Sequence, residues 1–186
     1  MKQKPLFKKY AIVALATLVA VAFIGVFYVL GLKTSMFLFA WQLNFALMAW
    51  ISVVNAQLKP RLRSSYFDAF AFEQDGKIYA YLGVNWFRRF LVLVGWEKIT
   101  RKNMPVSNSI SDIKKYERAT RESEYGHWIV AIIVILISIY IYIQYSLVQI
   151  IWLMVLNVLF NIYPIFLQRY NRPRLQIIIS RYSSIK

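Results

Sequence analysis

The stretch that decides the fold runs from His127 to Gln168, HWIVAIIVILISIYIYIQYSLVQIIWLMVLNVLFNIYPIFLQ. It contains no Lys, Arg, Asp or Glu in 42 residues. A helix needs about 20 residues to cross the hydrocarbon core of a bilayer, so this stretch is long enough for two spans. The polar turn Gln144-Tyr145-Ser146 divides it into two arms of similar length, at about 127–145 and 147–168. A hairpin of this kind places His127 and Gln168 at the same membrane face.

Two further stretches without charged residues precede this hairpin, Tyr10 to Leu32 and Ser35 to Leu58. They predict spans at about 10–31 and 35–57. The first is too long for the apolar part of a signal peptide and has no small-residue cleavage site, so we expect it to be retained. With 59% hydrophobic residues, the chain belongs to the membrane class. We predict an all-α integral membrane protein with four transmembrane helices in a single membrane domain, 1–186.

The net charge of +15 is distributed around the spans. Four Lys precede the first span, thirteen Lys and Arg lie from Lys59 to Arg121, and five follow the fourth span. The loop between the first and second spans contains only Lys33, and the loop between the third and fourth spans contains no charged residue. The positive-inside rule therefore predicts a multi-pass protein of the cell membrane with both termini and the central region in the cytoplasm. Basic residues that flank spans favour membrane lipids as partners and argue against nucleic acid.

The central region, 59–125, holds all eight acidic residues and is expected to be cytoplasmic or interfacial. Glu73 to Lys77 is a turn signal between two aromatic-rich runs and is compatible with a short β-hairpin. The alternatives for the central region are a re-entrant segment and an interfacial helix. Asn85 to Trp96 pairs arginines with aromatic residues, which is typical of a segment lying in the membrane interface. Ser111 to Gly126 is compatible with a helix that continues directly into the third span.

Glu124 and His127 are the candidate catalytic residues. They are three positions apart, so they share one face of a helix and can touch. A carboxylate beside an imidazole orients it and increases its basicity, as a general base requires. The alternative is an interfacial histidine beside an ordinary solvated glutamate. Glu-x-x-His also binds metals, but such sites need a second pair, and the chain has one histidine and no cysteine. No metal and no cofactor is therefore predicted.

Three arginines follow the fourth span closely, Arg169, Arg172 and Arg174. Guanidinium groups match phosphate oxygens, so the cluster could bind phosphate. The alternative is that these arginines anchor the span. Pro173 is expected to end the helix near Arg172. The tyrosine and the asparagine between the arginines add hydrogen-bonding groups that anchoring does not require.

Asn157, Asn161 and Gln168 recur at spacings of four and seven, which places them on one polar stripe of the fourth span. Polar side chains in hydrocarbon face a substrate or a neighbouring helix. Asn44 and Asn55 in the second span are candidate partners for the second possibility. The predicted substrate-binding residues are Asn161, Gln168, Arg169, Tyr170, Asn171, Arg172 and Arg174.

Three strings carry a resemblance to a known family: Glu124-Tyr125-Gly126-His127-Trp128, Asn161-Ile162-Tyr163-Pro164, and Gln168-Arg169-Tyr170-Asn171-Arg172-Pro173-Arg174-Leu175. Together they resemble the glycosyl-4,4'-diaponeurosporenoate acyltransferases, small bacterial membrane proteins of carotenoid biosynthesis. The resemblance is strong over about 119–175, weaker over 66–98 and absent over the first span. It implies transfer of a fatty acyl chain to a sugar hydroxyl of a glycosylated carotenoid acid.

Two hypotheses follow. In the first, the protein is a membrane acyltransferase whose His127 takes a proton from the acceptor hydroxyl, which then attacks an acyl thioester or acyl lipid. Glu124 orients the imidazole, and the arginines hold the phosphates of an acyl donor or a phospholipid headgroup. Asn161 and Gln168 either donate to the developing oxyanion or position the substrate. The acceptor is lipid-linked, and the acyl donor is a co-substrate. In the second, the protein is a non-enzymatic lipid-binding or assembly subunit of a membrane complex.

Overall fold

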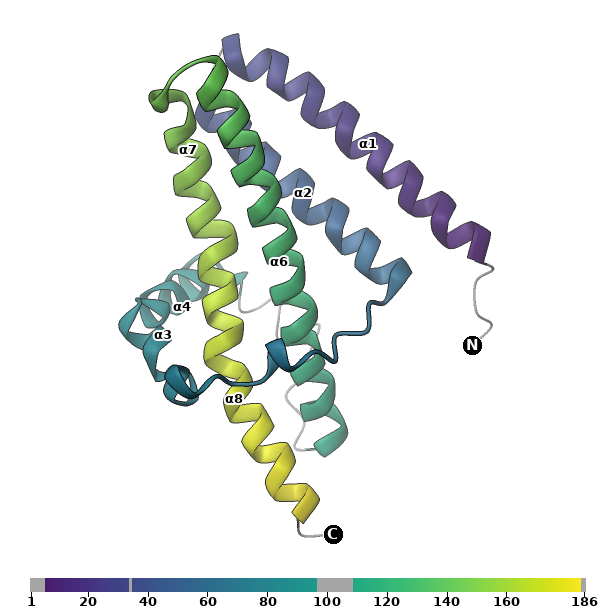
Figure 1. Cartoon of the computed structure of the whole chain (residues 1–186), viewed down its shortest axis with the longest axis vertical. Helices are drawn as coiled ribbons and strands as arrows, with labels where there is room; N and C mark the ends of the chain where they lie inside the picture. Colours follow the sequence, from purple (N-terminus) through teal and green to yellow (C-terminus); the bar gives the residue numbers. More distant parts are fainter. Residues whose placement is uncertain (1–5, 34, 97–108, 185–186) are drawn as a thin grey trace. The chain divides into compact units, whose positions relative to one another are not determined.

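The computed structural model describes residues 6–33, 35–96 and 109–184, and every regular element in these ranges is helical (Figure 1). The α-helices are α1 (Leu6–Lys33), α2 (Met36–Leu58), α3 (Lys77–Tyr81), α4 (Val84–Leu93), α6 (Ile110–Gln144), α7 (Leu147–Asn157) and α8 (Tyr163–Ser184). The short elements are the 3₁₀ turns η1 (Ser65–Phe67) and η2 (Ala71–Gly76) and a π-helical turn, η3 (Val158–Ile162). The predicted all-α class is confirmed.

Four stretches are long and apolar enough, by length and composition, to cross a membrane. They are Leu6–Leu30, Met36–Leu58, Ile110–Gln144 and Leu147–Ser184. Each covers one of the predicted spans to within one residue, and the last two are longer than predicted because their helices continue into charged sequence. The charged residues before Gly126 form one helix with the third span, as the sequence predicts.

The predicted β-hairpin around Glu73 to Lys77 is wrong. The chain does turn there, but it turns from η2 directly into α3. Gly76 has a φ of 87°, a left-handed conformation that glycine adopts without strain. The Glu73 carboxylate accepts a hydrogen bond from the backbone N–H of Phe70 at 2.9 Å. This local bond satisfies a backbone donor that a hairpin ladder would otherwise use.

The predicted helix end near Arg172 is also wrong, because α8 continues through Pro173 to Ser184. A proline inside a helix removes one N–H donor and strains one turn. Here side chains on both sides of the proline bind α6. Arg172 Nε donates to Thr120 Oγ1 at 3.0 Å, and Gln176 Nε2 donates to Glu117 Oε1 at 3.2 Å. These contacts hold the two turns of α8 that adjoin Pro173.

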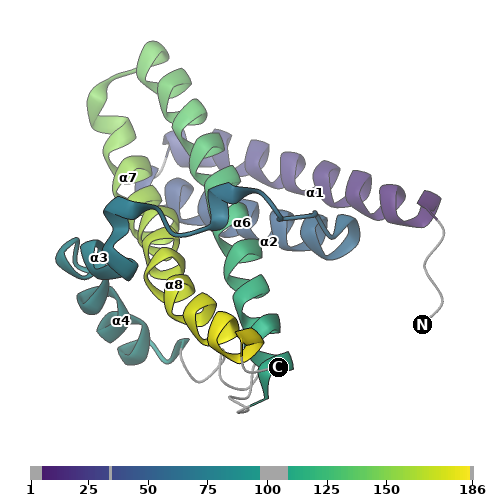
Figure 2. The same cartoon turned by 60° about the horizontal axis from the view of Figure 1, so that its bottom comes forward.

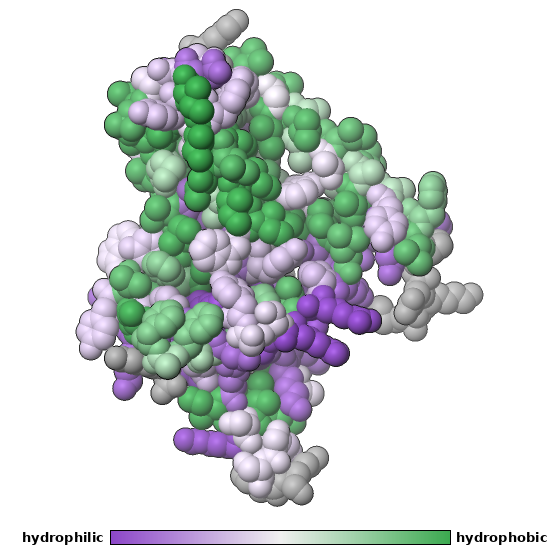
Figure 3. All heavy atoms as spheres, viewed as in Figure 1, coloured by the Kyte–Doolittle hydropathy of each residue, from purple (hydrophilic) through white to green (hydrophobic). Residues whose placement is uncertain are grey.

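The residues group into two compact units. The first unit comprises 1–61 and 125–162, and the second comprises 62–124 and 163–186. Within the first unit, α7 runs beside the apolar part of α6 (Figures 1 and 2). On the face shown in Figure 3, most of the surface of this pair is hydrophobic, as expected for helices surrounded by lipid. The buried core of the first unit comprises Phe39, Ala40, Leu43, Leu47, Ile51, Val130, Val134, Ile141, Leu153 and Leu156.

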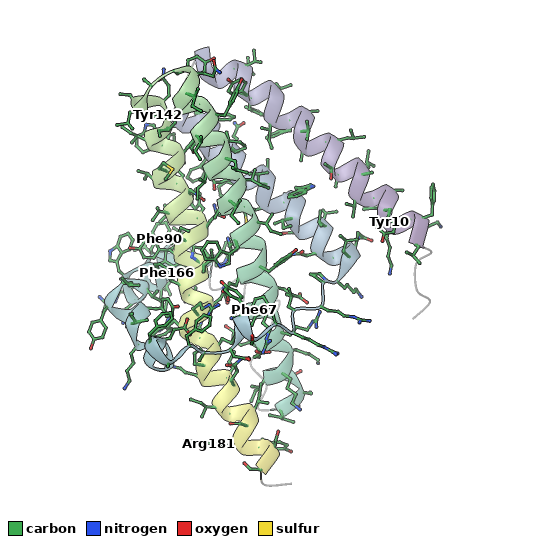
Figure 4. The ribbon with its side chains drawn as sticks, viewed as in Figure 1. Tyr10, Phe67, Phe90, Tyr142, Phe166 and Arg181 are labelled. Atoms are coloured by element: carbon green, nitrogen blue, oxygen red, sulfur yellow. The ribbon has the colours of Figure 1, made fainter. Side chains whose placement is uncertain are left out.

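In the second unit, α3 and α4 pack against α8 through a small aromatic cluster. Tyr79, Val84 and Tyr170 are its buried members, and Phe166 packs against them. Figure 4 labels Phe166 on α8 and Phe90 on α4. The cluster fixes the position of α4 relative to the part of α8 that contains the predicted substrate-binding residues.

Candidate active site

The π turn η3 gives the fourth apolar stretch its one irregular segment, and Pro164 follows it directly. Pro164 has no N–H to donate to the Phe160 carbonyl, so the α-helical hydrogen-bond pattern is interrupted there. A wider π turn accommodates this interruption, and such turns are frequent at functional sites. Asn161 lies within the turn and is completely buried.

Three asparagines of the first unit form a buried chain of hydrogen bonds. Asn44 Nδ2 donates to the Ala40 carbonyl at 2.9 Å, and Asn157 Nδ2 donates to the Ala131 carbonyl at 3.2 Å. Because a carbonyl can only accept, these two contacts fix which amide atom is nitrogen. The Oδ1 atoms of Asn44 and Asn157 must therefore accept elsewhere. Asn161 Nδ2 donates to both of them, at 2.7 Å and 2.8 Å.

The remaining amide atom of Asn161 determines the proton position on His127. Asn161 Oδ1 lies 3.3 Å from His127 Nδ1, and the backbone carbonyl of Phe160 is the ring's other hydrogen-bond neighbour. Both neighbours accept, so the ring must donate, and a neutral imidazole has one N–H. The contact with Asn161 is a hydrogen bond in the tautomer that carries the proton on Nδ1, and in that tautomer Nε2 has the lone pair. An imidazole held in this tautomer can act as a base through Nε2.

This chain bears on the two interpretations of the polar stripe. Hydrogen bonding between helices is confirmed for Asn157 and Asn161, with Asn44 as the predicted partner from the second span. The expectation that Asn161 donates to an oxyanion does not fit this arrangement, because both of its N–H groups are already used. The side chain beside His127 Nδ1 is Asn161, whereas Glu124 was expected from the sequence to orient the ring.

In the second unit, Arg169 is buried among acceptors. Its Nε donates to Glu124 Oε1 at 2.8 Å, its Nη1 to Glu73 Oε1 at 3.0 Å, and its Nη2 to the Tyr66 carbonyl at 2.6 Å. The guanidinium also lies over the rings of Tyr66 and Phe70, at 4.4 Å and 4.9 Å. Every nitrogen of this arginine thus has a partner inside the protein.

Arg172 is buried in the same cluster and also pairs with Glu124, through Nη2 and Oε2. Its other contacts are the hydroxyl and the carbonyl of Thr120, at 3.0 Å and 3.1 Å, and the Phe67 carbonyl. We call Glu73, Glu124, Arg169 and Arg172 the buried ion network. Its two carboxylates balance its two guanidinium groups, which is the condition under which buried charges are tolerated.

Two tyrosines complete the network as hydrogen-bond donors. Tyr66 Oη donates to Glu124 Oε1 at 2.9 Å, and Tyr79 Oη donates to Glu73 Oε1. Burial, together with the charge of Glu124, raises the pKa of the Tyr66 phenol. Burial and the hydrogen bond to Glu73 raise the pKa of the Tyr79 phenol. Both phenols therefore remain protonated and able to donate.

This network was not predicted from the sequence. Arg169 and Arg172 were expected to face phosphate and Glu124 to face His127, whereas the structure gives all three side chains partners in the second unit. The pairing with Glu73 was missed because that residue lies 96 positions before Arg169. A usable signal was present, since Glu73 lies in the weaker part of the family resemblance. Substrate binding by these arginines remains a prediction.

The other predicted binding residues line or adjoin a pocket of the second unit. The Arg174 guanidinium lies 3.8 Å from the centre of the Tyr170 ring, and that of Arg88 lies 5.7 Å from it. The pocket has a volume of about 690 Å³ and includes the predicted residues Gln168 and Asn171. Its full lining is Asn85, Arg88, Arg89, Leu91, Val92, Trp96, Tyr116, Ala119, Thr120, Ser123, Leu167, Gln168 and Asn171.

Metal binding has little support from the arrangement of side chains. Within residues 6–33, 35–96 and 109–184, no group of three or more His, Cys, Asp or Glu side chains gathers as metal ligands would. The acidic groups that do lie close to one another, Glu73 and Glu124, are paired with arginines.

Four stretches of helix long and apolar enough to cross a membrane define the class, a multi-pass membrane protein of the all-helical type. Comparison with protein families then identifies the family. Residues 63–181 match the family described as glycosyl-4,4'-diaponeurosporenoate acyltransferase. The match covers more than half of the chain, so the protein belongs to this family and is an acyltransferase of carotenoid biosynthesis. Comparisons with curated proteins and with solved structures give no significant match.

Family membership decides between the two hypotheses drawn from the sequence in favour of the enzyme. The matched range begins after α2, so the family resemblance excludes the first two spans. It contains the buried ion network, the pocket and η3, as well as His127.

Proposed function

We propose that the protein transfers a fatty acyl chain to a hydroxyl of a lipid-linked, glycosylated carotenoid acceptor at the cytoplasmic face of the membrane, with His127 as the general base. The observation that carries the proposal is the asparagine chain, because it presents an acceptor to Nδ1 of His127 and so supports the tautomer in which Nε2 has the lone pair. A histidine that served only as a membrane anchor would need no such fixed tautomer.

In the proposed reaction, Nε2 of His127 takes the proton of the acceptor hydroxyl as its oxygen attacks the acyl carbonyl carbon. A new C–O bond forms and gives a tetrahedral intermediate. The intermediate then collapses with cleavage of the bond to the thiolate or alkoxide of the donor. The imidazolium returns its proton to that leaving group, so the base is regenerated and charge is balanced.

Asn161 acts in this scheme as a positioning residue. Its Oδ1 accepts from Nδ1–H and supports the positive charge that develops on the ring during proton transfer. The two asparagines that bind its Nδ2 prevent the amide from rotating, so the oxygen stays directed at the ring. The oxyanion must then find its donors elsewhere, because both N–H groups of Asn161 are already used.

The buried ion network has a different proposed role. Glu124 and the two arginines hold α6, α8 and the segment around η1 and η2 together, rather than touching substrate. The residues left to contact substrate are then those with groups facing the pocket or the surface, Gln168, Asn171 and Arg174. Tyr170 supports the last of these through its ring.

The proposed membrane face follows from the charge distribution. Loops rich in Lys and Arg remain in the cytoplasm, and the basic residues flank the ends of the spans at which His127 and Gln168 lie. The acyl and polyprenoid chains of the substrates would remain in the hydrocarbon layer, while the hydroxyl and the acyl carbonyl meet at its edge.

The test is mass spectrometry of total lipids from cells that make glycosylated carotenoid acids and express either wild type or a variant at equal levels. His127→Gln is the informative variant, because its amide is polar and of similar length to the imidazole but cannot take up a proton at neutral pH. Tyr142→Phe is a control that removes a polar group from an exposed position on the same helix.

A lipid heavier by one acyl chain is expected with wild type and Tyr142→Phe and is expected to be missing with His127→Gln. Formation of that lipid by His127→Gln at the wild-type rate would refute the assignment of the base. Its mass and fragmentation would also identify the acceptor.

A further inference from the structure

The pocket of the second unit is built by three segments that are distant in sequence. α4 contributes Asn85 to Val92, α6 contributes Tyr116 to Ser123, and α8 contributes Leu167, Gln168 and Asn171. Its volume of about 690 Å³ lies within the range of small-molecule sites, about 300 to 1,000 Å³. A pocket of this size in a small helical protein is suited to the headgroup of an amphiphile.

The charge of the lining has one sign. Two arginines, Arg88 and Arg89, line the pocket, and none of the residues that line it is Asp or Glu. Neither arginine forms an ion pair with another residue in the described part of the chain. This distinguishes them from Arg169 and Arg172, whose guanidinium groups are buried and paired with carboxylates. Unpaired guanidinium groups at a concave surface attract an anion, and their donor geometry matches phosphate.

The arginine at the pocket wall is also held in place. The guanidinium of Arg88 lies over the ring of Tyr170, whose side chain is buried. The guanidinium of Arg174 also lies over this ring. Around the arginines, the amides of Asn85, Gln168 and Asn171 supply neutral donors. A tetrahedral oxyanion needs several donors from different directions, and this lining offers both charged and neutral ones.

The remaining lining is apolar, from Leu91, Val92, Trp96 and Leu167. Anionic and apolar ligand groups can therefore bind in the same pocket. A free inorganic anion would leave this apolar surface exposed to water, whereas an acyl chain next to a phosphate would cover it. The lining is thus complementary to a phosphate ester that carries a long chain.

We propose that this pocket binds the phosphate group of the acyl donor, with Arg88 and Arg89 as its cationic ligands, in place of the buried arginines of α8. The ligand class is a phosphate ester attached to a fatty acyl chain. Two sources share this chemistry, an acyl-coenzyme A and a phospholipid. The inference rests on the proposed function only in assigning a fatty acyl chain to the ligand.

The experiment measures equilibrium binding without turnover, on purified full-length protein that carries His127→Ala, in a neutral maltoside detergent. The radiolabelled probes are palmitoyl-coenzyme A, dipalmitoyl phosphatidylglycerol and monopalmitoylglycerol, of which the last has no phosphate. The sharpest comparison is Ala119→Asp against Ala119→Asn, because these side chains have nearly the same size and differ in charge at the pocket wall. Arg89→Gln is paired with Arg181→Gln, an exposed arginine of α8 outside the pocket (Figure 4).

At least one phosphate-bearing probe is expected to bind more tightly than monopalmitoylglycerol. Arg89→Gln should weaken that binding roughly tenfold, the equivalent of one charge-assisted hydrogen bond. Ala119→Asp should weaken it at least as much, whereas Ala119→Asn and Arg181→Gln should leave it unchanged. Binding of palmitoyl-coenzyme A alone would identify a thioester donor, and binding of phosphatidylglycerol alone would identify a lipid donor.

Equal affinities for Ala119→Asp and Ala119→Asn, or equal binding of monopalmitoylglycerol, would overturn the inference. The outcome is separable from that of the proposed function. If the phosphate-bearing probes bind but wild type transfers no acyl chain, only the proposed function is overturned. If wild type transfers an acyl chain but no phosphate-bearing probe binds, only the pocket assignment is overturned.

Discussion

Replacing Glu124 by Gln tests whether the buried ion network holds the second unit together. The side chain is completely buried, and its carboxylate accepts hydrogen bonds from Arg169, Arg172 and Tyr66. Gln has the same shape, but it leaves two guanidinium groups with one carboxylate, that of Glu73. Removing one partner of a buried ion pair costs about 3 to 5 kcal/mol, because a charge is left uncompensated.

For a chain of 186 residues, each kcal/mol lowers the melting temperature by about 2 to 4 °C, so Glu124→Gln should lower it by about 6 to 20 °C. Thermal unfolding of the purified protein, followed by circular dichroism at a fixed detergent concentration, measures this shift. The control is Glu122→Gln, whose carboxylate pairs with Arg118 at the surface, at 2.9 Å and 41% side-chain exposure. Exposed pairs contribute about 0 to 1 kcal/mol, so the control should unfold within a few degrees of wild type.

A double variant tests the pairing itself. Glu124→Gln combined with Arg172→Met leaves Arg169 and Glu73, which again balance each other. The double variant should therefore be more stable than the sum of the two single changes predicts, by about 0.5 to 3 kcal/mol. Strictly additive effects, or a Glu124→Gln variant that melts within about 2 °C of wild type, would refute the reasoning.

Two more predictions follow from the geometry. Gly76→Ala should destabilise the second unit by about 1 to 3 kcal/mol, because Gly76 has a left-handed φ and a Cβ there would lie 2.8 Å from the Tyr170 carbonyl oxygen. Gly95 has a similar φ of 78°, but a Cβ added there would lie in open space. The difference in melting temperature between Gly76→Ala and Gly95→Ala therefore measures the steric part of the destabilisation. Asn161→Leu should lower kcat at least roughly tenfold, with KM nearly unchanged, because His127 loses the acceptor that fixes its tautomer. Kinetics in detergent check this, and a kcat equal to that of wild type would show that the tautomer does not limit the reaction.

Hydropathy and charge were sufficient to predict the four spans, since a helix in lipid must be apolar over its whole length. Helical periodicity was also sufficient to bring Asn44 and Asn161 together, although they are 117 residues apart, because both lie inside spans. Neither signal reaches the region between α2 and α6. There the partners are set by tertiary contacts, so the turn at Gly76 was recognised but its helical continuation was not.

The fate of Pro173 illustrates the same limit. Local chemistry favours a helix end at that position, and the sequence analysis followed it. The helix persists because Arg172 and Gln176 bind α6 on either side, and no local pattern contains that information. In the site, the residue types were correctly singled out, but their partners depended on which carboxylates and carbonyls the fold brings near them.

The buried ion network also has a consequence for the order of events during synthesis. Its carboxylates lie in η2 and α6, and both guanidinium groups lie in α8, which the ribosome makes last of these elements. Until α8 emerges, Glu73 and Glu124 must stay hydrated or protonated, because a buried carboxylate without a cation is too costly. The region between α2 and α6 therefore cannot complete its folding while it is being translated. Its native packing begins only when the arginines of the last helix arrive.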